Sequence, residues 1–295
     1  MDLLNGRNAG PVRLRELMAK PGLVVAPGCY DALSARLVEE AGFDACYMTG
    51  FGTAAGYLGR PDVGLLTMSE MVDNGRRIVG AVGLPLIADG DTGYGNAINV
   101  VRTVHEYERA GISAIQLEDQ VMPKKCGHMA GKAVVPAAEA TKKIVAAVAA
   151  RSNDDFVIIA RTDARATDGL DAAIERARMF RDAGADVLFI EALLNEAEIE
   201  KVAETFRGTP LFFNWAEGGK TPPLSQTQIA DMGFKILIFP IGTLFAATKA
   251  MRTLLAAVKQ HGTPTQAAEQ LVGFDEFLDF IGLPEIRSIE EQFRE

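Results

Sequence analysis

Eight short apolar runs recur along the 295-residue chain, and each is followed by a segment with helical periodicity. The runs are continuous rather than alternating, which is typical of parallel strands buried on both faces. They lie at Leu23–Ala26, Ala45–Met48, Leu86–Ala88, Ala114–Leu117, Phe156–Ala160, Val187–Ile190, Leu211–Phe213 and Ile236–Phe239. Among the intervening segments, amphipathic helices are predicted at Ala32–Ala41, Asn99–Ala110, Glu139–Ala150, Asp171–Ala183 and Glu196–Phe206.

Repetition of one strand–helix unit indicates the fold class. Three predicted helices are followed by Gly42, Gly111 or Gly184, and glycine adopts the left-handed conformation that ends a helix. Eight such units fit an α/β fold of the closed (β/α)8 TIM-barrel type. An open doubly wound sheet is the alternative, disfavoured because no Gly-x-Gly-x-x-Gly follows the first run. We predict one barrel domain over residues 1–295, with residues 245–295 as a helical C-terminal extension.

The charge and cysteine content limit the partners and the compartment. The net charge is −9, which disfavours nucleic acid and anionic membranes as partners. No apolar run approaches the roughly 18 residues of a membrane span, and Met1–Lys20 lacks the basic-then-apolar order of a signal peptide. The three cysteines, Cys29, Cys46 and Cys126, are too few for a disulfide framework. We therefore expect a cytoplasmic protein with a small-molecule ligand.

Polar residues gather where the predicted strands end, which is where barrels of this type carry their chemistry. They are Thr49, Gly50, Phe51, Asp89, Asp91, Glu118, Arg161, Glu191, Asn214 and Pro240. Carboxylates that repel one another at one barrel mouth need a cation to offset them. Asp89 and Asp91 point the same way on an extended chain, and oxygen ligands favour Mg²⁺, with Mn²⁺ as a substitute. Glu118 is expected to hold a metal-bound water.

A basic, glycine-flanked segment, Met122–Lys132, follows the fourth predicted strand and suits a mobile lid. It presents Cys126, whereas the other two cysteines are interpreted as core residues. Lys124, Lys125 and His128 are expected to favour the thiolate and to bring the pKa of Cys126 below about 8.5. Such a thiol can give or take a proton near neutral pH. A covalent nucleophile is the alternative role, but no Ser/Cys-His-Asp order accompanies it.

Three motifs together resemble the isocitrate lyase/phosphoenolpyruvate mutase superfamily over nearly the whole chain. They are Asp89-Gly90-Asp91-Thr92-Gly93-Tyr94-Gly95, Lys124-Lys125-Cys126-Gly127-His128 and Ala160-Arg161-Thr162-Asp163-Ala164. The resemblance implies an α/β barrel whose last helix is swapped between subunits, in a homotetramer built from dimers. It also implies Mg²⁺ at Asp89 and Asp91, with Asp62 and Glu118 holding metal-bound waters.

The resemblance also assigns roles in binding and catalysis. The substrate implied is a small 2-hydroxy carboxylate. The substrate-binding residues would be Thr49, Gly50, Phe51, Gly127, Arg161, Glu191, Asn214, Pro240 and Phe245. Lyases of the superfamily use a cysteine at position 126 as the acid that protonates the departing carbanion, whereas its phosphonate mutases place other residues there. The family usually has Ser where Thr49 stands, so the hydroxyl is kept.

Two aromatic residues narrow the substrate within this resemblance. Methylisocitrate lyases place two arginines around the extra carboxylate of a tricarboxylate, and Phe245 and Phe274 align with those positions. Because the guanidinium forks are missing, an alkyl-substituted malate is expected, as in the 2,3-dimethylmalate lyases, which the loop also resembles. Methylisocitrate cleavage is the alternative. Oxaloacetate decarboxylation or hydrolysis is a further alternative, disfavoured because Pro240 stands where oxaloacetate hydrolases typically carry Ser.

The resulting hypothesis is a Mg²⁺-dependent retro-aldol (Claisen-type) cleavage to pyruvate and a carboxylic acid. Tyr47, Glu118 or a metal-bound hydroxide would remove the 2-hydroxyl proton, and the sequence does not choose among them. Lys125, His128, Glu191 and Asn214 would stabilise the enediolate, and Cys126 would protonate its carbon. A non-catalytic metabolite-binding barrel is the alternative from another class of protein, but a binder has no need of a loop thiol.

Overall fold

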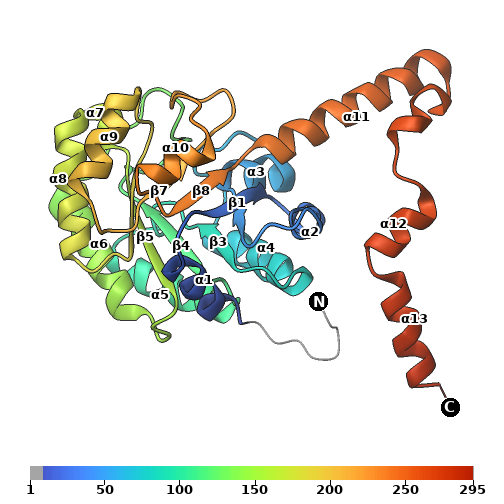
Figure 1. Cartoon of the computed structure of the whole chain (residues 1–295), viewed down its shortest axis with the longest axis horizontal. Helices are drawn as coiled ribbons and strands as arrows, with labels where there is room; N and C mark the ends of the chain where they lie inside the picture. Colours follow the sequence, from blue (N-terminus) through green and yellow to red (C-terminus); the bar gives the residue numbers. More distant parts are fainter. Residues whose placement is uncertain (1–8, 295) are drawn as a thin grey trace. The chain divides into compact units, whose positions relative to one another are not determined.

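Eight parallel strands form the sheet of the computed structural model, which describes residues 9–294 (Figure 1). They are β1 (Val24–Cys29), β2 (Cys46–Met48), β3 (Leu86–Asp89), β4 (Ala114–Glu118), β5 (Val157–Thr162), β6 (Val187–Ile190), β7 (Phe212–Asn214) and β8 (Ile236–Phe239). Residues 1–8 and 295, which include the start of Met1–Lys20 and both ends of the predicted domain, lie outside the described residues.

The sheet closes on itself. Hydrogen bonds join the strands in the order β6-β5-β4-β3-β2-β1-β8-β7. An isolated parallel bridge between Leu188 and Leu211 links the two ends of this order, and the Leu188 N–H donates to the Pro210 carbonyl at 3.0 Å. The predicted (β/α)8 barrel is therefore confirmed, and the open doubly wound alternative is wrong.

Helices follow the strands around the barrel. In chain order they are α1 (Gly10–Ala19), α2 (Ala32–Glu40), α3 (Gly50–Thr53), the π-helix η1 (Ala54–Leu58), α4 (Met68–Ala81), α5 (Ala97–Arg109), α6 (Ala137–Ala150), α7 (Ala164–Thr167), α8 (Leu170–Asp182), α9 (Glu196–Thr205) and α10 (Gln226–Asp231). The five predicted helices end within two residues of these bounds. Gly42, Gly111 and Gly184 have φ angles of 81°, 82° and 96°, the left-handed conformation predicted for them.

Several strands run further than their apolar sequence suggests. The run Phe156–Ala160 predicts a strand that stops before Arg161, but β5 includes both Arg161 and Thr162. Glu118 likewise ends β4 and pairs in register with Arg161. Backbone hydrogen bonding does not require an apolar side chain, so the ladder continues into the polar mouth. The predicted boundary at Ala160 is therefore wrong, because it marks the end of the apolar core and not the end of the strand.

The strands bury their two faces in two separate apolar clusters. Val157 and Ile159 belong to a cluster with residues from all eight strands, which fills the inside of the barrel. Ile158 and Ala160 belong to the other cluster, which lies between the strands and the surrounding helices. Alternation along an extended strand produces this division. Residues two apart on one strand therefore face the same side of the barrel wall.

Helix α1 closes the end of the barrel at which the strands begin. Leu14 is fully buried in the inner cluster, and Leu17 and Met18 pack against it. Arg15 fixes the helix there, because its guanidinium contacts Asp186 at 2.8 Å and donates to the Phe156 carbonyl at 3.3 Å. This end of the barrel is filled by side chains, so the opposite end is left for a site.

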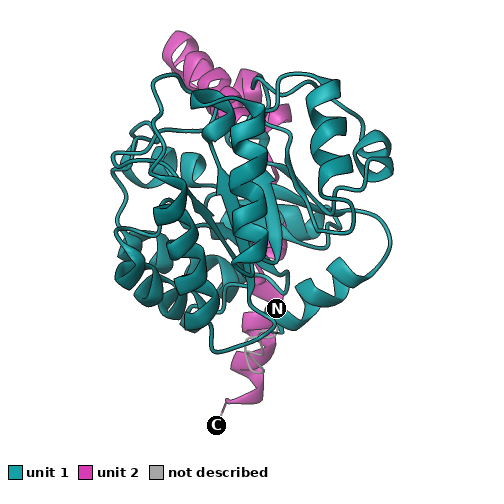
Figure 2. Ribbon diagram, turned by 90° about the vertical axis from the view of Figure 1, so that its left-hand side faces the viewer, with its two compact units in different colours: residues 1–244 teal, residues 245–295 magenta. Residues whose placement is uncertain are grey.

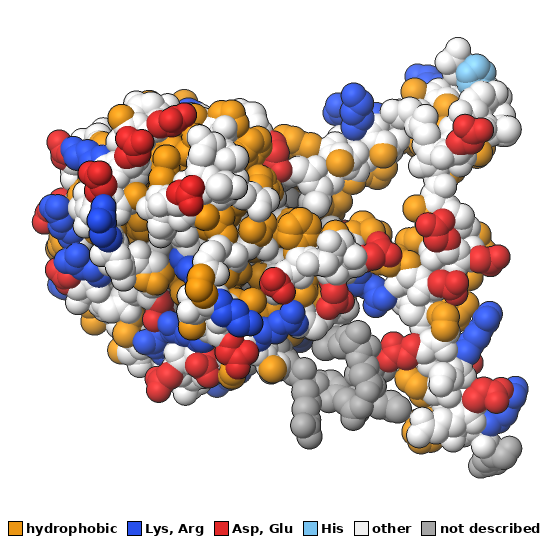
Figure 3. Space-filling view, in the orientation of Figure 1, with side chains coloured by type: hydrophobic (Ala, Val, Ile, Leu, Met, Phe, Trp, Pro, Cys, Tyr) orange, Lys and Arg blue, Asp and Glu red, His pale blue; other side chains and the backbone are white. Residues whose placement is uncertain are grey.

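The segment after Leu244 forms a second compact unit, shown in magenta in Figure 2. It contains most of α11 (Gly242–His261), the 3-10 helix η2 (Thr265–Gln270), α12 (Phe274–Phe280) and α13 (Leu283–Gln292). Large apolar side chains are exposed along it, including Met251, Leu255, Val272, Phe274 and Phe293 (Figure 3). No helix in the described part of the chain is long and apolar enough to cross a membrane.

Substitution of Leu14 tests whether the contacts of α1 stabilise the barrel. Leu14→Ala should lower the free energy of unfolding by about 2–5 kcal/mol, because it opens a cavity in the inner cluster. Val12 lies on the same helix and is 46% exposed, so Val12→Ala should change stability by no more than about 0.5 kcal/mol. Urea denaturation followed by circular dichroism measures both, and equal losses for the two variants would contradict this account of α1.

Candidate active site

The inward face of each strand changes from apolar to polar at the same end of the barrel. Ile87 is followed two residues later by Asp89, Ile159 by Arg161, and Phe189 by Glu191. Position parity therefore brings one set of side chains into the mouth: Tyr47, Asp89, Gln116, Glu118, Arg161, Glu191 and Asn214. Closure of the barrel makes residues from distant parts of the chain converge, as the sequence predicts for all of these except Gln116.

Arg161 lies at the centre of this set. Its Nε donates to Asp163 at 2.9 Å, and its Nη atoms lie 3.4 Å from Glu118 and 3.2 Å from Glu191. The guanidinium also lies over the ring of Phe189, 5.2 Å from its centroid. Burial lowers the pKa of Arg161, but Asp163, Glu191 and Glu118 outweigh this effect and raise the pKa well above its ordinary value. A fixed positive charge is thus held where a substrate carboxylate would bind.

A second cluster of carboxylates surrounds the buried side chain of Lys124. Its Nζ lies 2.7 Å from Oδ1 of Asp62 and 2.6 Å from Oδ1 of Asp91, and the side chain is only 2% exposed. Burial lowers the pKa of Lys124, but Asp91 and Glu118 outweigh it and raise the pKa well above its ordinary range. Lys124 therefore neutralises the carboxylate cluster, a role that the sequence analysis did not assign to it.

Asp91 is held in an unusual conformation and an unusual environment. Its φ angle is 47°, in the left-handed region that residues other than glycine rarely adopt, and its N–H donates to Asp89 Oδ1 at 3.0 Å. Burial raises the pKa of Asp91 to about 7, although Lys124 opposes the shift. Backbone strain of this kind is concentrated at functional sites.

The residues at this mouth fit a hard divalent cation in composition and charge. Six carboxylates lie here, those of Asp62, Asp89, Asp91, Glu118, Asp163 and Glu191, against three cations, Lys124, Lys132 and Arg161. Buried Glu118 Oε1 has no hydrogen-bond partner among residues 9–294. Among the described residues, no three Asp, Glu, His or Cys side chains are already arranged around one metal position. A cation would bind here through oxygen atoms and water.

Glycine is required at two points of the mouth because the backbone approaches charged side chains. A Cβ atom on Gly50 would lie 2.5 Å from Oδ2 of Asp89, and one on Gly127 would lie 2.4 Å from Nη2 of Arg161. Thr49, which precedes Gly50, caps α3 by accepting from the Gly52 N–H at 3.2 Å. These contacts place the predicted residues Thr49, Gly50 and Gly127 at the mouth.

The loop that carries Cys126 is fastened to the barrel by backbone contacts. Gln120 at the end of β4 accepts from the Lys125 N–H at 2.9 Å and donates to the Lys125 carbonyl at 2.8 Å. The Cys126 N–H donates to the Asp62 carbonyl at 3.2 Å. The ammonium of Lys125 donates to the Gly131 carbonyl at 2.7 Å, within the loop. Cys126 is therefore held beside the carboxylate cluster, and Gln120 is a positioning residue that the sequence analysis did not single out.

The predicted lowering of the Cys126 pKa is wrong. Burial raises the pKa of this thiol, and the nearby carboxylates of Asp62 and Glu191 raise it further. The backbone of His128 and the charge of Arg161 oppose this shift without reversing it, while Lys124 is paired with carboxylates and Lys125 with a carbonyl. The thiol is consequently protonated at neutral pH, which suits a proton donor better than a nucleophile.

His128 is neutral and carries its proton on the nitrogen that faces Glu191. Its Nδ1 accepts from the Lys220 N–H at 3.1 Å, so Nε2 carries the hydrogen and lies 3.5 Å from Glu191 Oε1. Burial lowers the pKa of His128, although Glu191 opposes this. Asn214 donates to the other oxygen of Glu191 at 3.2 Å. Three of the predicted residues thus form one hydrogen-bonded group.

Tyr47 is placed as a donor rather than a base. Its hydroxyl donates to Gln116 Oε1 at 3.2 Å. Burial, followed by the charge of Asp89, raises the pKa of Tyr47 well above its ordinary value. Gln116 is itself fully buried, and no described residue forms a hydrogen bond with its Nε2. The same position parity that places Glu118 in the mouth would have identified Gln116 from the sequence.

The remaining predicted residues lie near the end of the sheet or in the second unit. Pro240 follows β8, and its carbonyl approaches Gly28 so closely that a Cβ there would lie 2.2 Å from the oxygen. Phe51 lies in α3. Phe245 and Phe274 belong to the second unit, where their side chains are 47% and 78% exposed. Their predicted effect on substrate choice stays a prediction.

The sequence matches known proteins over nearly its whole length. The family model described as phosphoenolpyruvate phosphomutase matches residues 14–259. The chain belongs to this family. The 2,3-dimethylmalate lyase of Eubacterium barkeri is 50% identical over 281 residues, which cover 95% of this chain and 97% of that protein. The 2-methylisocitrate lyase of Aeropyrum pernix is 47% identical over 269 residues, covering 91% of this chain and 86% of that one.

Solved structures give the same relationship. A crystal structure of 2,3-dimethylmalate lyase, described as a PEP mutase/isocitrate lyase superfamily member, aligns with a TM-score of 0.92 and 41% identity, covering 97% of this chain and 95% of that one. Oxaloacetate acetylhydrolase, bound to 3,3-difluorooxalacetate, aligns with a TM-score of 0.91 and 39% identity over 96% and 97%. Phosphonopyruvate hydrolase, in complex with oxalate and Mg²⁺, aligns at 0.88 and 33% over 97% and 99%. The predicted superfamily is confirmed.

The pH dependence of alkylation tests the environment of Cys126. Because burial raises the pKa of the thiol, the rate of reaction with iodoacetamide should rise with pH with a midpoint above the ordinary value of about 8.5. Cys29 and Cys46 are fully buried and should not react in the folded protein. Mass spectrometry of the labelled protein measures the rate, with Cys126→Ser as the unlabelled control. A midpoint below 8.5 would restore the thiolate interpretation.

Proposed function

We propose that the protein is a Mg²⁺-dependent carbon–carbon lyase. Its substrate would be an alkyl-substituted malate, similar to 2,3-dimethylmalate, and its products pyruvate and a carboxylic acid. The observation that carries the proposal is a protonated loop thiol, Cys126, beside a buried guanidinium, Arg161, and a carboxylate cluster. The 50% identity to a 2,3-dimethylmalate lyase supports the substrate class.

The cation that this chemistry needs would be held by the carboxylate cluster. We assign Asp89 and Asp91 as its ligands, with Asp62 and Glu118 holding its waters, and Mn²⁺ as a substitute for Mg²⁺. The excess of carboxylates over cations and the unpartnered oxygen of Glu118 support this assignment. Phosphonopyruvate hydrolase, a structural neighbour, is described with Mg²⁺. Bound at this position, the ion would polarise the oxygen at C2 of the substrate.

The residues around the cluster account for the rest of the cleavage. Arg161, whose Nε and Nη2 are held by Asp163, would bind the substrate carboxylate through its remaining Nη donors. Glu118, whose Oε1 is bonded by no described residue, would accept the 2-hydroxyl proton in its ionised form, although burial raises its pKa. Tyr47 is less suited to this role, because burial raises its pKa well above the ordinary value and its hydroxyl already donates to Gln116. As the C2–C3 bond breaks, Cys126 would give its proton to the carbon that leaves.

The negative charge of the departing fragment needs donors on its other side. His128 Nε2–H and the Asn214 amide already point toward Glu191, so they form a donor pair at the edge of the mouth. Lys125, in the same loop as Cys126, would add a positive charge close to the reacting carbon. Backbone groups of Thr49, Gly50 and Phe51 would meet the remaining substrate oxygens, with Gly127 and Pro240 completing the substrate pocket.

Two further activities are favoured by specific comparisons. Methylisocitrate cleavage is supported by the 47% identity to a 2-methylisocitrate lyase. Oxaloacetate hydrolysis or decarboxylation is supported by the structural likeness to oxaloacetate acetylhydrolase. Phe245 and Phe274 in place of arginines weigh against the first, and Pro240 against the second. A non-catalytic binding barrel would not need the protonated thiol at Cys126.

The assembly and the location follow as parts of the same proposal. We infer a homotetramer in which the α11–α13 segment packs against a second copy of the chain, with its helix swapped between subunits. Apolar side chains that are exposed along this segment, among them Leu255 and Val272, support a partner surface. The three free cysteines suit the reducing cytoplasm. The net charge of −9 leaves nucleic acid and membranes as unfavourable partners.

A panel of 2-hydroxy acids tests the proposed activity. With Mg²⁺ present, 2,3-dimethylmalate should be cleaved with a kcat/KM about tenfold or more above that for 2-methylisocitrate. Release of pyruvate or another 2-oxo acid is measured for each acid, and oxaloacetate is included with analysis of its products. Activity should disappear in EDTA and return with added Mg²⁺. Preference for 2-methylisocitrate would refute the substrate assignment, and binding without turnover of any acid would favour the non-catalytic barrel.

Substitution of Cys126 tests its role as the acid. Cys126→Ser should lower kcat by about 10²–10⁴-fold, because a hydroxyl is a far weaker acid than a thiol. Cys46→Ala changes a buried thiol in β2, away from the mouth, and serves as the matched control. Undiminished turnover in Cys126→Ser would remove Cys126 from the mechanism, while loss of activity in both variants would indicate a general effect on the fold.

A further inference from the structure

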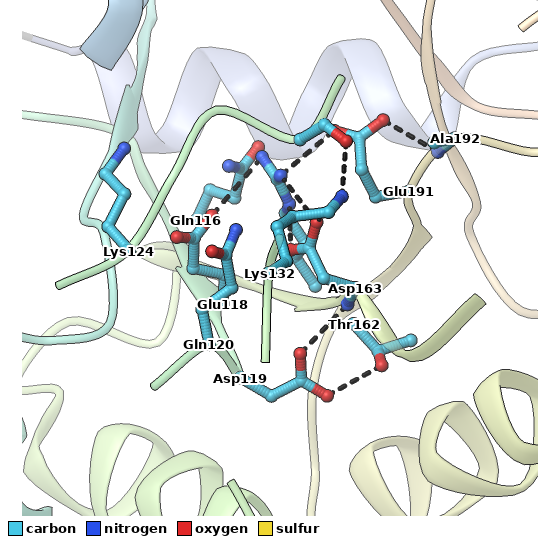
Figure 4. Close-up of polar contacts among 12 residues, drawn as sticks. Gln116, Glu118, Asp119, Gln120, Lys124, Lys132, Thr162, Asp163, Glu191 and Ala192 are labelled. Carbon is cyan, nitrogen blue, oxygen red and sulfur yellow. Dashed lines mark hydrogen bonds and ion pairs between the residues drawn. The ribbon is translucent and has the colours of Figure 1, made fainter. Parts of the chain in front are cut away.

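Lys132 places a buried ammonium at the far end of the Cys126 loop. This ammonium has no part in the proposed chemistry. Its side chain is 2% exposed, and its Nζ lies 2.7 Å from Oδ1 of Asp163, which is fully buried. The same ammonium donates to the carbonyl of Gly127, the residue that follows Cys126. The Lys132 side chain therefore joins the turn at Gly127 to Asp163, the residue that follows β5 (Figure 4).

The Gly127 carbonyl is held by Lys132, while other contacts hold the residues around it. Gln120 holds the loop at Lys125, and the Cys126 N–H donates to the Asp62 carbonyl at 3.2 Å. After the thiol, His128 Nδ1 accepts from the Lys220 N–H at 3.1 Å, and the Met129 N–H donates to the Cys126 carbonyl at 2.8 Å, which shapes the turn. Among the described residues, the ammonium of Lys132 joins the Gly127 carbonyl to the strand-end carboxylate of Asp163.

Asp163 connects this bond to the substrate-binding guanidinium. It accepts from Arg161 Nε at 2.9 Å and from Nη2 at 3.1 Å while it also pairs with Lys132. Its own N–H donates to Asp119 at 2.9 Å, which fixes the carboxylate in turn. Burial raises the pKa of Asp163, but Arg161 and Lys132 outweigh it and bring the pKa to about 2. Asp163 thus remains charged throughout the working pH range.

The close fit of Gly127 limits how far the turn can move. A Cβ at this position would lie 2.4 Å from Nη2 of Arg161 and 2.6 Å from Oε2 of Glu191, so the backbone lies directly against both groups. A displacement of the Gly127 carbonyl would therefore also displace Cys126 relative to the guanidinium. Misplacement of a reacting group by about 1 Å can reduce a rate by about 10²-fold.

We propose that Lys132 is a positioning residue, which sets the place of the Cys126 thiol relative to Arg161 by holding the Gly127 carbonyl against Asp163. This inference rests on the proposed role of Cys126 as the acid. Lys132 does not touch the substrate in this account. It acts on the proton-transfer step, and its loss should lower kcat while KM changes little.

Three variants test the proposal. Lys132→Met keeps the aliphatic chain and removes the ammonium, and it should lower kcat by about 10–100-fold with KM changed by less than about threefold. Lys132→Arg retains the charge and the donors and should recover a large part of that loss. Lys201→Met is the matched control, because Lys201 forms an equally short ion pair with Asp171, at 2.7 Å, on the exposed surface. It should leave both constants unchanged.

Alkylation of Cys126 gives a readout that does not depend on the substrate. Lys132→Met should raise the rate of labelling by iodoacetamide at fixed pH severalfold, because the turn no longer holds the thiol in its buried place. Unchanged labelling and unchanged kcat in Lys132→Met would overturn the proposal, as would a loss carried entirely by KM. If no acid in the panel is cleaved, the proposed function fails, and the labelling rates of Lys132→Met and Lys132→Arg still decide the positioning role. If Lys132→Met does not fold, Lys132→Arg is compared with Lys132→Gln. Equal kcat values and equal rates of Cys126 labelling in these two variants would also overturn the proposal.

Discussion

The buried guanidinium of Arg161 is the interaction on which the rest of the mouth depends. It lies among Glu118, Asp163 and Glu191, and burying such carboxylates is costly without a positive neighbour. Removal of one partner from a buried ionic group leaves an uncompensated charge, which costs several kcal/mol. The barrel strands hold Arg161 and its three carboxylate partners in fixed positions, which offsets the cost of burying their charges.

The Cys126 loop adds the two remaining cations to this arrangement. Lys124 reaches the Asp62 and Asp91 pair, and Lys132 reaches Asp163, so each end of the loop is bound to a rim carboxylate. Both ammonium groups are paired with carboxylates, and burial of the thiol between them raises its pKa. The loop therefore carries an acid that stays protonated, although the sequence around it is strongly basic.

Much of this could be predicted from the sequence, and the failures have identifiable physical causes. Apolar runs revealed every strand, because buried β-residues are selected for hydrophobicity along the full run. The same signal placed the end of β5 at Ala160, since hydropathy cannot detect a strand whose last inward residue is Arg161. The ends of the predicted strands were sufficient to place Asp89 and Glu191 at the mouth. The pKa of Cys126 was wrongly expected to be lowered, because the sequence does not show that the neighbouring Lys124 pairs with Asp62 and Asp91 in the folded protein.

The division of each strand into inward and outward residues also constrains how such a protein can change. Ile158 and Arg161 lie on opposite sides of one barrel wall, separated by an odd number of positions. A single inserted or deleted residue within β5 would exchange the two faces and turn the guanidinium toward the helices. Such a barrel can accept substitutions and insertions in its loops, but not the insertion or deletion of one residue within a strand. The distance along the strand between an inward apolar residue such as Ile159 and an inward polar residue such as Arg161 must stay even, so the barrel mouth is inherited as a count of residues as much as a set of side chains.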